Sequence, residues 1–262
     1  MEGDYTSLAA NISDFIRSTL ETAGFSKVVV NVSGGVDSAV AAALATQAVG
    51  RQHVIIAMMP YGDLGAQAIN DARLLVEALQ IPQEQVFTFD IKRPVDTISE
   101  QAADLEPTRL GNIMARVRMI YLFDLAKRLG ALVCGTENRT EYYLGYFTRF
   151  GDEASDIEPV RGLYKTQVWD LARALNLPAQ IIEKTPTADL WENQTDEGEF
   201  HFSYQDADNV LSCYFDEHLT LDDIVARGIP RDIVERVLAR VAANDFKHQL
   251  PYVSRRSLPL AP

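Results

Sequence analysis

The sequence predicts an α/β protein with a doubly wound parallel sheet of about five strands, flanked by helices and built as a single domain. Short apolar runs alternate with longer helical stretches through the first half of the chain, which is the pattern of a parallel sheet covered by helices on both faces. The first apolar run leads through glycines into an alanine-rich stretch, a strand, turn and helix in succession. With 262 residues and 47% hydrophobic content, the chain can bury one large core.

Each expected element follows from the spacing of apolar residues. Apolar side chains at helical spacing from Leu8 to Leu20 predict an amphipathic helix over 5–22 that ends at Gly24. The alternating runs that follow predict strands at 28–32, 54–58, 85–89 and 131–134, and helices at 38–49, 66–79, 94–103 and 109–129. A fifth short strand is expected around 157–160.

The second half of the chain is expected to complete the same domain, which spans 1–262. Residues 184–204 are polar and acidic with little periodicity, which favours a mobile active-site lid over a linker. A helical part follows over 205–250, and it includes a helix over 231–243 with one apolar face.

Composition argues against several classes of function. The net charge of −13 argues against nucleic acid or an anionic membrane surface as the main partner. The two cysteines, Cys134 and Cys213, support neither a disulfide framework nor a Cys-type zinc site. The sequence has no apolar stretch of about 18 residues and begins with acidic residues, so we expect a cytoplasmic enzyme without a membrane partner.

The most informative segment is S-G-G-V-D-S at 33–38, between the first expected strand and the first alanine-rich helix. Its glycines allow backbone N–H groups to close around an anion at the positive end of that helix, and pyrophosphate is the expected guest. Asp37 would repel phosphate unless Mg²⁺ lies between them, so this carboxylate implies a metal. The segment lacks the Walker A lysine, which argues against ordinary γ-phosphoryl transfer. The alternative is a Gly-Gly turn capped by Ser and Asp, which the flanking strand and helix disfavour.

Two further charged residues belong to the same expected edge of the sheet. Glu141 follows the 131–134 strand, where its carboxylate can share Mg²⁺ with Asp37; the alternative is an ordinary charge at a helix start. Lys165 begins a helix, where a lysine opposes the helix dipole and is better explained by a bound phosphate.

The chain contains, in this order, the motifs S-G-G-x-D-S, M-P-Y-G, A-R-x-R-M, G-T-x-N-R-x-E, L-G-Y-F-T-[KR]-[YF]-G-D, L-Y-K-T-Q-V, P-[ST]-A-x-L-W and Q-T-D-E. Taken together, these motifs resemble those of the ammonia-dependent NAD synthetases, within the ATP pyrophosphatase superfamily, over nearly the whole chain. The resemblance implies a sheet of the adenine-nucleotide hydrolase type and a homodimer. It also implies amidation of deamido-NAD to NAD by ammonia through an NAD-adenylate intermediate, with ATP as co-substrate, Mg²⁺ as cofactor, and AMP and pyrophosphate as products.

The resemblance assigns roles to particular residues as well. It implies that ATP is contacted by Asn31, Val32, Ser33, Gly34, Gly35, Val36, Asp37, Ser38, Thr136, Lys165 and Thr187, and Mg²⁺ by Asp37 and Glu141. It implies that deamido-NAD is contacted by Arg116, Arg149, Asp156, Phe246 and Lys247. Arg149 stands where lysine is expected, which changes the donor geometry. Phe246 stands where histidine is frequent, so its contact is either stacking or absent.

The implied chemistry needs no protein nucleophile, so catalysis is expected from orientation and charge neutralisation, with Lys165 among the catalytic residues. Ammonium must lose a proton before it attacks, and Asp152 or Asp156 is the candidate base. Because the chain has no room for a glutaminase domain, we expect ammonia rather than glutamine as the nitrogen source. The rival interpretations are another amidating or thiolating ATP pyrophosphatase and a non-catalytic nucleotide-binding module; the paired carboxylates Asp37 and Glu141 argue against the module.

Overall fold

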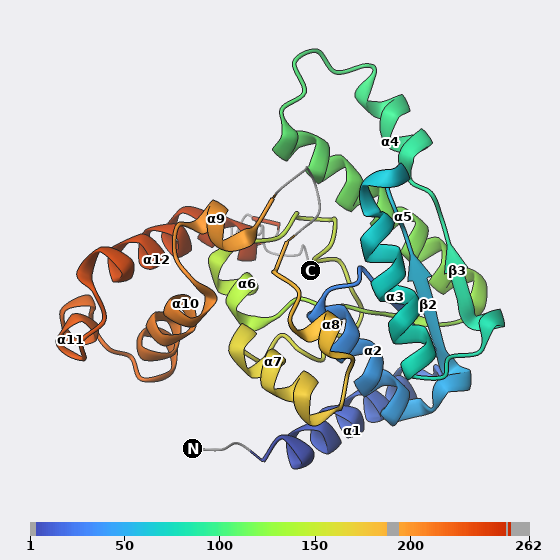
Figure 1. Ribbon diagram of the computed structural model, residues 1–262, viewed down its shortest axis with the longest axis horizontal. Coiled ribbons are helices and arrows are strands. Elements are labelled where there is room, and N and C mark those ends of the chain that lie inside the picture. Colours follow the sequence, from blue (N-terminus) through green and yellow to red (C-terminus); the bar gives the residue numbers. More distant parts are fainter. Residues whose placement is uncertain (1–3, 188–193, 250, 253–262) are drawn as a thin grey trace, which may run out of the picture.

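The computed structural model describes residues 4–187, 194–249 and 251–252, and the described residues form a parallel sheet of four strands (Figure 1). The strands are β1 (Val28–Asn31), β2 (Val54–Met58), β3 (Val86–Thr88) and β4 (Leu132–Cys134), in the order β3-β2-β1-β4. All three pairings are parallel. The direction of winding reverses between β1 and β4, so the carboxyl ends of these strands mark the position where open α/β sheets bind ligands.

The sheet has four strands rather than the five expected, in the part of the chain that the structure describes. The segment around 157–160 makes a single isolated parallel bridge, between Cys134 and Ile157. Pro159 has no N–H to continue a ladder. In addition, Oδ2 of Asp156 accepts the backbone N–H of Val133 at 2.8 Å, so a side chain occupies a donor that another strand would use.

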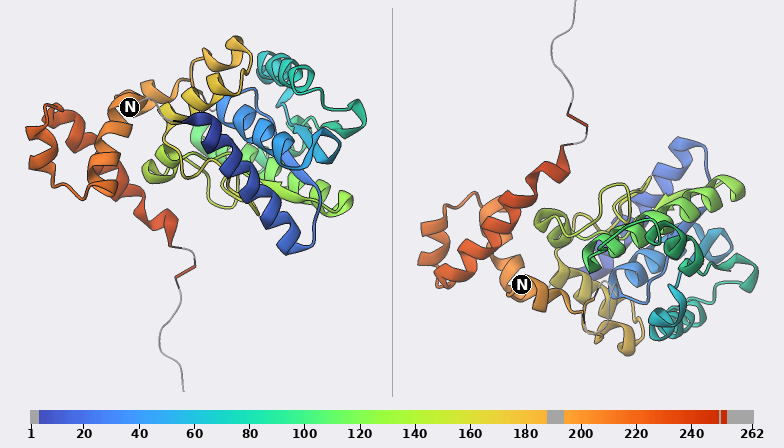
Figure 2. Two further views of the ribbon diagram at one scale, coloured as in Figure 1. Left: turned by 90° about the horizontal axis from the view of Figure 1, so that it is seen from below. Right: turned by 90° about the horizontal axis from the view of Figure 1, so that it is seen from above.

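Helices cover both faces of the sheet, as the alternating pattern predicts (Figures 1 and 2). One face packs against α1 (Tyr5–Ala23), α2 (Val36–Val49), α3 (Ala66–Ala78), α7 (Lys165–Ala174) and α8 (Ala179–Ile182). The other face packs against α4 (Lys92–Ser99) and α5 (Pro107–Leu129). Val28 and Val30 point to the first face and Val29 to the second, which is the two-residue alternation of a strand. The expected doubly wound arrangement is therefore confirmed.

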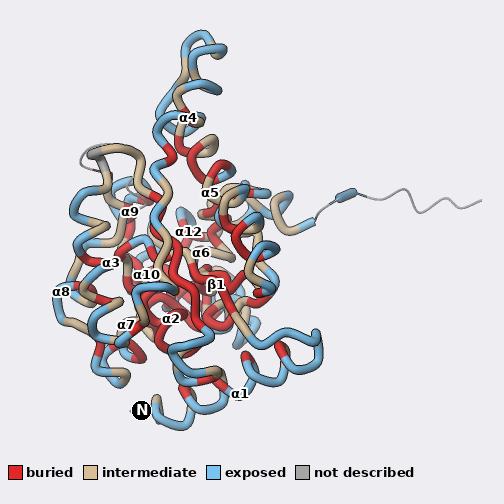
Figure 3. The backbone as a smooth tube through the Cα atoms, turned by 90° about the vertical axis from the view of Figure 1, so that its right-hand side faces the viewer, coloured by how far each residue is buried: buried red, intermediate tan, exposed pale blue. Residues whose placement is uncertain are grey.

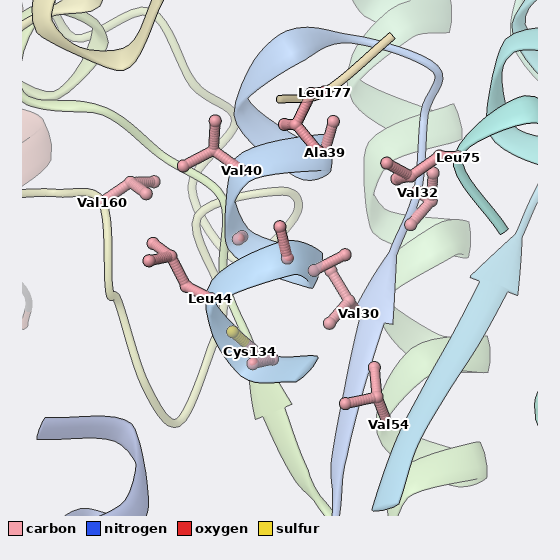
Figure 4. Packing of buried hydrophobic residues seen from close by; sticks show 14 of the residues in the cluster. Val30, Val32, Ala39, Val40, Leu44, Val54, Leu75, Cys134, Val160 and Leu177 are labelled. Carbon is pink, nitrogen blue, oxygen red and sulfur yellow. The ribbon is translucent and has the colours of Figure 1, made fainter. Parts of the chain in front are cut away.

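Helix α2 lies at the centre of the core (Figure 3). Every residue from Ser38 to Ala45 is buried, because a helix that is apolar all round can be covered on all sides. In Figure 4, Val40 and Leu44 of α2 pack in one cluster with Val30 and Val32, which belong to β1 and the residue after it. This packing holds the start of α2, and with it the 33–38 loop, against the sheet.

The C-terminal helices form a third hydrophobic cluster beside the sheet (Figure 2). They are α9 (Asp196–Phe200), α10 (Tyr204–Leu211), α11 (Leu221–Ala226) and α12 (Arg231–Asn244), together with α6 (Arg139–Leu144). Trp169 of α7 packs against both this cluster and the sheet's first-face core, which joins the two into one domain. Short helical turns complete the described chain: 3₁₀ turns at Arg51–His53, Gly62–Gly65, Gln83–Gln85 and Asp245–His248, and a π turn at Ser212–Asp216.

The segment 184–204, predicted as a lid, is more regular than expected. Residues 188–193 lie outside the described part of the chain, but α9 begins within the segment. Thr195 caps α9 by accepting the N–H of Gly198 at 3.2 Å, and Ser203 caps α10 by accepting the N–H of Asp206 at 3.1 Å. These short-range caps stabilise helices that a search for apolar periodicity passes over; the role as a lid stays a prediction. Across the described residues, we find no helix with the length and apolar character needed to cross a membrane.

Candidate active site

A cavity of about 510 Å³ opens at the carboxyl ends of the strands. Its walls include the 31–38 loop after β1, Met59 to Tyr61 after β2, and Gly135 and Thr136 after β4. On the side of the C-terminal helices, Arg240 of α12 is part of the cavity wall. The turns after these three strands therefore meet in one cavity at the switch point of the sheet.

The loop at 33–38 has the backbone conformation that its glycines allow. Gly34 has φ of +79°, and a Cβ at this position would lie 2.6 Å from the backbone oxygen of Ala68 in α3. Ser38 Oγ donates to the carbonyl of Gly35 at 2.9 Å, where α2 begins. A side chain on Gly34 would push α3 away, so glycine is required both for the left-handed φ and for the close approach.

Three charged side chains from three helices meet at the edge of the cavity. The ammonium of Lys165, the first residue of α7, lies 2.5 Å from Oδ2 of Asp37 in α2 and 3.2 Å from Oε1 of Glu141 in α6. Desolvation alone would lower the pKa of Lys165, but the two carboxylates more than offset it, and the net effect raises that pKa. Burial raises the pKa of Glu141 to about 7, although Lys165 opposes this shift.

Asn138 connects the start of α6, which carries Glu141, to the carboxylate of Asp37. It is the N-cap of α6, where its Oδ1 accepts the N–H of Glu141 at 3.0 Å. Its Nδ2 donates to Oδ1 of Asp37 at 2.9 Å. Asn138 is fully buried, so one amide fixes both the start of α6 and the orientation of Asp37.

A second buried group positions Lys165. Asp208 of α10 accepts the hydroxyl of Thr140 at 2.5 Å and the N–H of Thr166 at 2.8 Å. The hydroxyl oxygen of Thr140 in turn accepts the N–H of Lys165 at 2.9 Å. The first turn of α7 is thereby capped by side chains from α6 and α10, since its own first N–H groups have no partner within the helix.

Tyr204 links the charged cluster to α9. Its hydroxyl lies 3.3 Å from Oε1 of Glu141 and 2.9 Å from Oδ2 of Asp196, and its ring lies 4.9 Å from the ammonium of Lys165. Tyr146 reaches the same aspartate, donating to its Oδ1 at 3.0 Å. Burial raises the pKa of Asp196, with Lys165 opposing the shift.

The structure brings most of the predicted site residues to the cavity. Those that line it are Asn31, Val32, Ser33, Gly35, Val36, Asp37, Ser38, Thr136, Glu141, Asp152, Lys165, Thr187 and Lys247. Of the predicted residues, all of which the structure describes, those outside the lining are Gly34, Arg116, Arg149, Asp156 and Phe246.

Three of the residues outside the lining contact one another. Arg116 Nε donates to the backbone oxygen of Arg149 at 3.3 Å. The guanidinium of Arg149 lies 5.0 Å from the ring centroid of Phe246, a cation–π distance. The two departures from the resemblance therefore pair with each other. Lys247, by contrast, lies at the cavity and donates to the carbonyls of Gly145 at 2.6 Å and Phe147 at 2.9 Å.

The two candidate bases are in different environments. Asp152 lines the cavity, and its Oδ1 accepts the N–H of Thr148 at 2.9 Å. Its side chain is accessible to solvent through the cavity, yet the surrounding protein desolvates it enough to raise its pKa. Asp156 lies outside the lining and caps Val133 of β4.

Comparison with known proteins decides the family. The profile of the NAD synthase family matches residues 8–251. The chain belongs to this family. A protein of Fusobacterium nucleatum named NH(3)-dependent NAD(+) synthetase is 41% identical over 242 residues, which cover 92% of this chain and 93% of that protein.

Solved structures related to this NAD synthase family member have the same fold. An NMN synthetase from Francisella tularensis superposes with a TM-score of 0.85 at 30% identity, covering 97% of this chain and 100% of that one. An NH3-dependent NAD synthetase from Campylobacter jejuni, in complex with the nitrate ion, gives a TM-score of 0.82 at 28% identity with the same coverage.

The carboxylates of this family member fit a divalent ion that shares its coordination with substrate. Asp37 and Glu141 both reach one cation position, which the ammonium of Lys165 occupies. Within the described ranges, no cluster of three or more Asp, Glu, His or Cys side chains could hold a metal ion. Mg²⁺ commonly takes one or two protein carboxylates and completes its shell with phosphate oxygens and waters, so this pair suits an ion that arrives with a nucleotide.

The sequence pattern predicts no role for Asn138, Thr140, Tyr204 or Asp208. The role of Asn138 could have been predicted, because an asparagine four residues after a strand and directly before a helix is an N-cap signal. Nothing local in the sequence pointed to Asp208 or Tyr204, which reach the cluster from α10.

Proposed function

We propose that this chain amidates deamido-NAD to NAD with ammonia and consumes ATP to AMP and pyrophosphate. The observation that carries this proposal is the meeting of the 33–38 loop with Asp37, Lys165 and Glu141 in one cavity at the switch point of the sheet. Membership in the NAD synthase family supports the same conclusion.

The proposed reaction has two steps. An oxygen of the nicotinate carboxylate bonds to the α-phosphorus of ATP while the bond to the bridging oxygen breaks, and pyrophosphate leaves. The nitrogen of ammonia then bonds to the acyl carbon, the bond from this carbon to the AMP oxygen breaks, and one proton of the nitrogen is lost. The products are the amide, AMP and pyrophosphate.

The chain's own groups bind and orient the phosphates. The loop N–H groups at the start of α2 donate to the pyrophosphate portion, with Thr136 and Thr187 as further ATP contacts at the cavity wall. Lys165 offsets the charge that develops on the leaving group, from a buried position where such an interaction is strong. Asp37 and Glu141 would hold Mg²⁺, which when bound supplies further charge neutralisation at the pyrophosphate.

Asp152 is the proposed acceptor of the ammonium proton. Its carboxylate lies in the cavity wall, and burial raises its pKa toward neutral pH. A pKa nearer the working pH suits a general base. Asp156 is the other candidate, but its Oδ2 accepts the N–H of Val133, which argues against Asp156 as the base.

We also propose that two copies of the chain form a homodimer and that Arg116, Arg149, Asp156, Phe246 and Lys247 contact deamido-NAD. The homodimer is proposed from the family resemblance, since one exposed apolar side chain on α5, Ile120 at 61%, does not form a patch. Light scattering of the purified chain tests the dimer. A cytoplasmic location stays a prediction.

One incubation tests the reaction. The chain is mixed with ATP, Mg²⁺ and ammonium chloride, and with either deamido-NAD or nicotinate mononucleotide, and the nucleotides are separated. We expect NAD and AMP in equal amounts from deamido-NAD, and no product when glutamine replaces ammonium. Faster amidation of the mononucleotide would instead assign the activity named for the Francisella neighbour. ADP in place of AMP, or binding of ATP without turnover, would contradict the proposal.

A further inference from the structure

A second buried carboxylate lies beside the site, away from the Asp37–Lys165–Glu141 cluster. Asp71 of α3 is 1% exposed. Its Oδ1 accepts from Nε2 of Gln67 at 2.9 Å and from Nε2 of Gln180 in α8 at 2.6 Å. Its Oδ2 lies 3.0 Å from the ammonium of Lys184. A buried aspartate is retained at little cost only when its oxygens are well partnered. Gln180 and Lys184, which partner this one together with Gln67, lie more than a hundred residues further along the chain.

Asp71 is adjacent to the 33–38 loop. A Cβ built on Gly34 would lie 3.1 Å from the Cβ of Asp71. The helix that carries Asp71 therefore packs directly on the loop, and the position of the carboxylate is tied to the position of the loop.

Lys184 brings the other end of the ion pair into the cavity. Residues 184–187 all line the cavity that contains Ser33, Gly35 and Ser38. The contacts that hold the segment include the Lys184–Asp71 pair and the carbonyl of Pro186, which accepts the N–H of Asp196 at 3.1 Å.

The charge of the site calls for such a group. Lys165 is matched against two carboxylates at 2.5 and 3.2 Å, so that cluster has no net positive charge to offer a triphosphate. The chain as a whole carries −13. The Lys184–Asp71 pair is also neutral as a whole, but only Lys184 belongs to the cavity lining. The pair therefore presents its positive end to the cavity that contains the 33–38 loop, where pyrophosphate is expected.

We propose that Lys184 is a further phosphate-binding residue for the pyrophosphate portion of ATP and that Asp71 is the residue that positions it. This inference rests on the proposed function for its substrate. Asp71 acts through Lys184: its carboxylate holds the ammonium, and with it the 184–187 segment, against α3 at the wall of the cavity.

The test measures binding of inorganic pyrophosphate, with Mg²⁺ present, by calorimetry, and uses AMP as the internal comparison. For Lys184→Met we expect pyrophosphate affinity to fall by about ten- to one-hundred-fold, the range for loss of a hydrogen bond to a charged group, with AMP affinity unchanged. Lys184→Arg is expected to restore most of the loss. Lys127→Met, at an exposed lysine near the end of α5, is the matched control and is expected to bind as the parent chain does.

The positioning role of Asp71 is tested with a double-mutant cycle. We expect Asp71→Asn to weaken pyrophosphate binding on its own and to have no further effect in the Lys184→Met background. Full additivity of the two losses would overturn the positioning role, because a merely structural contribution does not depend on Lys184. Unchanged pyrophosphate affinity in Lys184→Met, with normal thermal unfolding, would overturn the phosphate role.

The inference and the proposed function can fail separately. If the parent chain forms NAD and Lys184→Met still binds pyrophosphate normally, the inference fails and the function stands. If the parent chain forms no NAD but Lys184→Met loses pyrophosphate affinity selectively, the phosphate site stands and the function fails.

Discussion

The ammonium of Lys165 lies 2.5 Å from Oδ2 of Asp37, across 128 positions of the chain. Asp37 belongs to the first turn of α2 and Lys165 to the first turn of α7, and these two helices pack against each other on one face of the sheet. The pair therefore links the 33–38 loop, at the start of α2, to the start of α7 at the cavity wall. When a nucleotide enters, Lys165 can exchange a carboxylate partner for a phosphate without leaving its buried position.

Replacing Lys165 tests its catalytic role. We expect Lys165→Met to lower kcat by about 10²- to 10³-fold, because a preorganised charge is removed from the leaving group. Steady-state formation of AMP measures the effect, and thermal unfolding checks that the variant folds. A folded Lys165→Met variant with nearly normal kcat would show that this lysine only balances Asp37 and Glu141.

The conformation of the loop can be tested with two glycines of nearly equal φ. Gly34 has φ of +79° and Gly24 has φ of +77°, but nothing lies within 4 Å of a Cβ added at Gly24, whereas Ala68 O lies 2.6 Å from one added at Gly34. Both Gly→Ala changes carry the strain of a left-handed residue, about 1 kcal/mol. We expect only Gly34→Ala to weaken ATP binding more than tenfold in a calorimetric titration. Equal ATP affinities in the two variants would contradict the close approach of α3 to the loop.

Asp152 and Asp156 can be separated by the step that each affects. We expect Asp152→Asn to lower kcat/KM for ammonium by about 10²-fold or more, in the range of general base catalysis, while exchange of labelled pyrophosphate into ATP continues. For Asp156→Asn we expect a lower free energy of unfolding, because the N–H of Val133 loses a charged acceptor. If Asp152→Asn leaves kcat/KM for ammonium unchanged, Asp152 is excluded as the base.

A buried glutamate outside the cavity lining predicts how stability depends on pH. Burial raises the pKa of Glu137 to about 9, although Arg161, 2.7 Å away, opposes the shift. Since the folded pKa lies above the unfolded value near 4.3, the protonated form favours folding. Its contribution is complete below about pH 4 and is lost as the pH rises through about 9.

Glu137→Gln keeps the size of this side chain and removes its titration. We expect the variant to be more stable than the parent at pH 8 by about 1 kcal/mol or more, since one pKa unit corresponds to about 1.4 kcal/mol. Urea unfolding between pH 5 and 9 measures the slope, and Glu84→Gln at an exposed position is the control. The same slope in the parent and Glu137→Gln would contradict the raised pKa.

The sequence was sufficient where local pattern decides the structure. Strand 54–58 has the bounds expected, and the helix after the loop starts at Val36, two residues before the expected start. The S-G-G-V-D-S segment also lies at the cavity as expected. Each of these depends on residues within one turn or strand of one another, so periodicity and turn chemistry report them directly.

The sequence was insufficient where contacts join distant segments. The expected fifth strand is limited to one bridge because Asp156 uses its side chain on Val133 and Pro159 has no donor. The partners of Asp71 in α8 and at Lys184 depend on how the helices pack, and no spacing in the sequence encodes them.

Transfer of oxygen from substrate to AMP tests the central claim most directly. Deamido-NAD labelled with ¹⁸O in its nicotinate carboxylate is incubated with the chain, ATP, Mg²⁺ and ammonium chloride, and the products are weighed by mass spectrometry. Attack of the carboxylate on the α-phosphorus, followed by release of AMP from the acyl carbon, predicts one ¹⁸O in the phosphate of AMP and one in the amide of NAD. AMP without label, or label in inorganic phosphate with ADP as the nucleotide product, would contradict adenylation at this site.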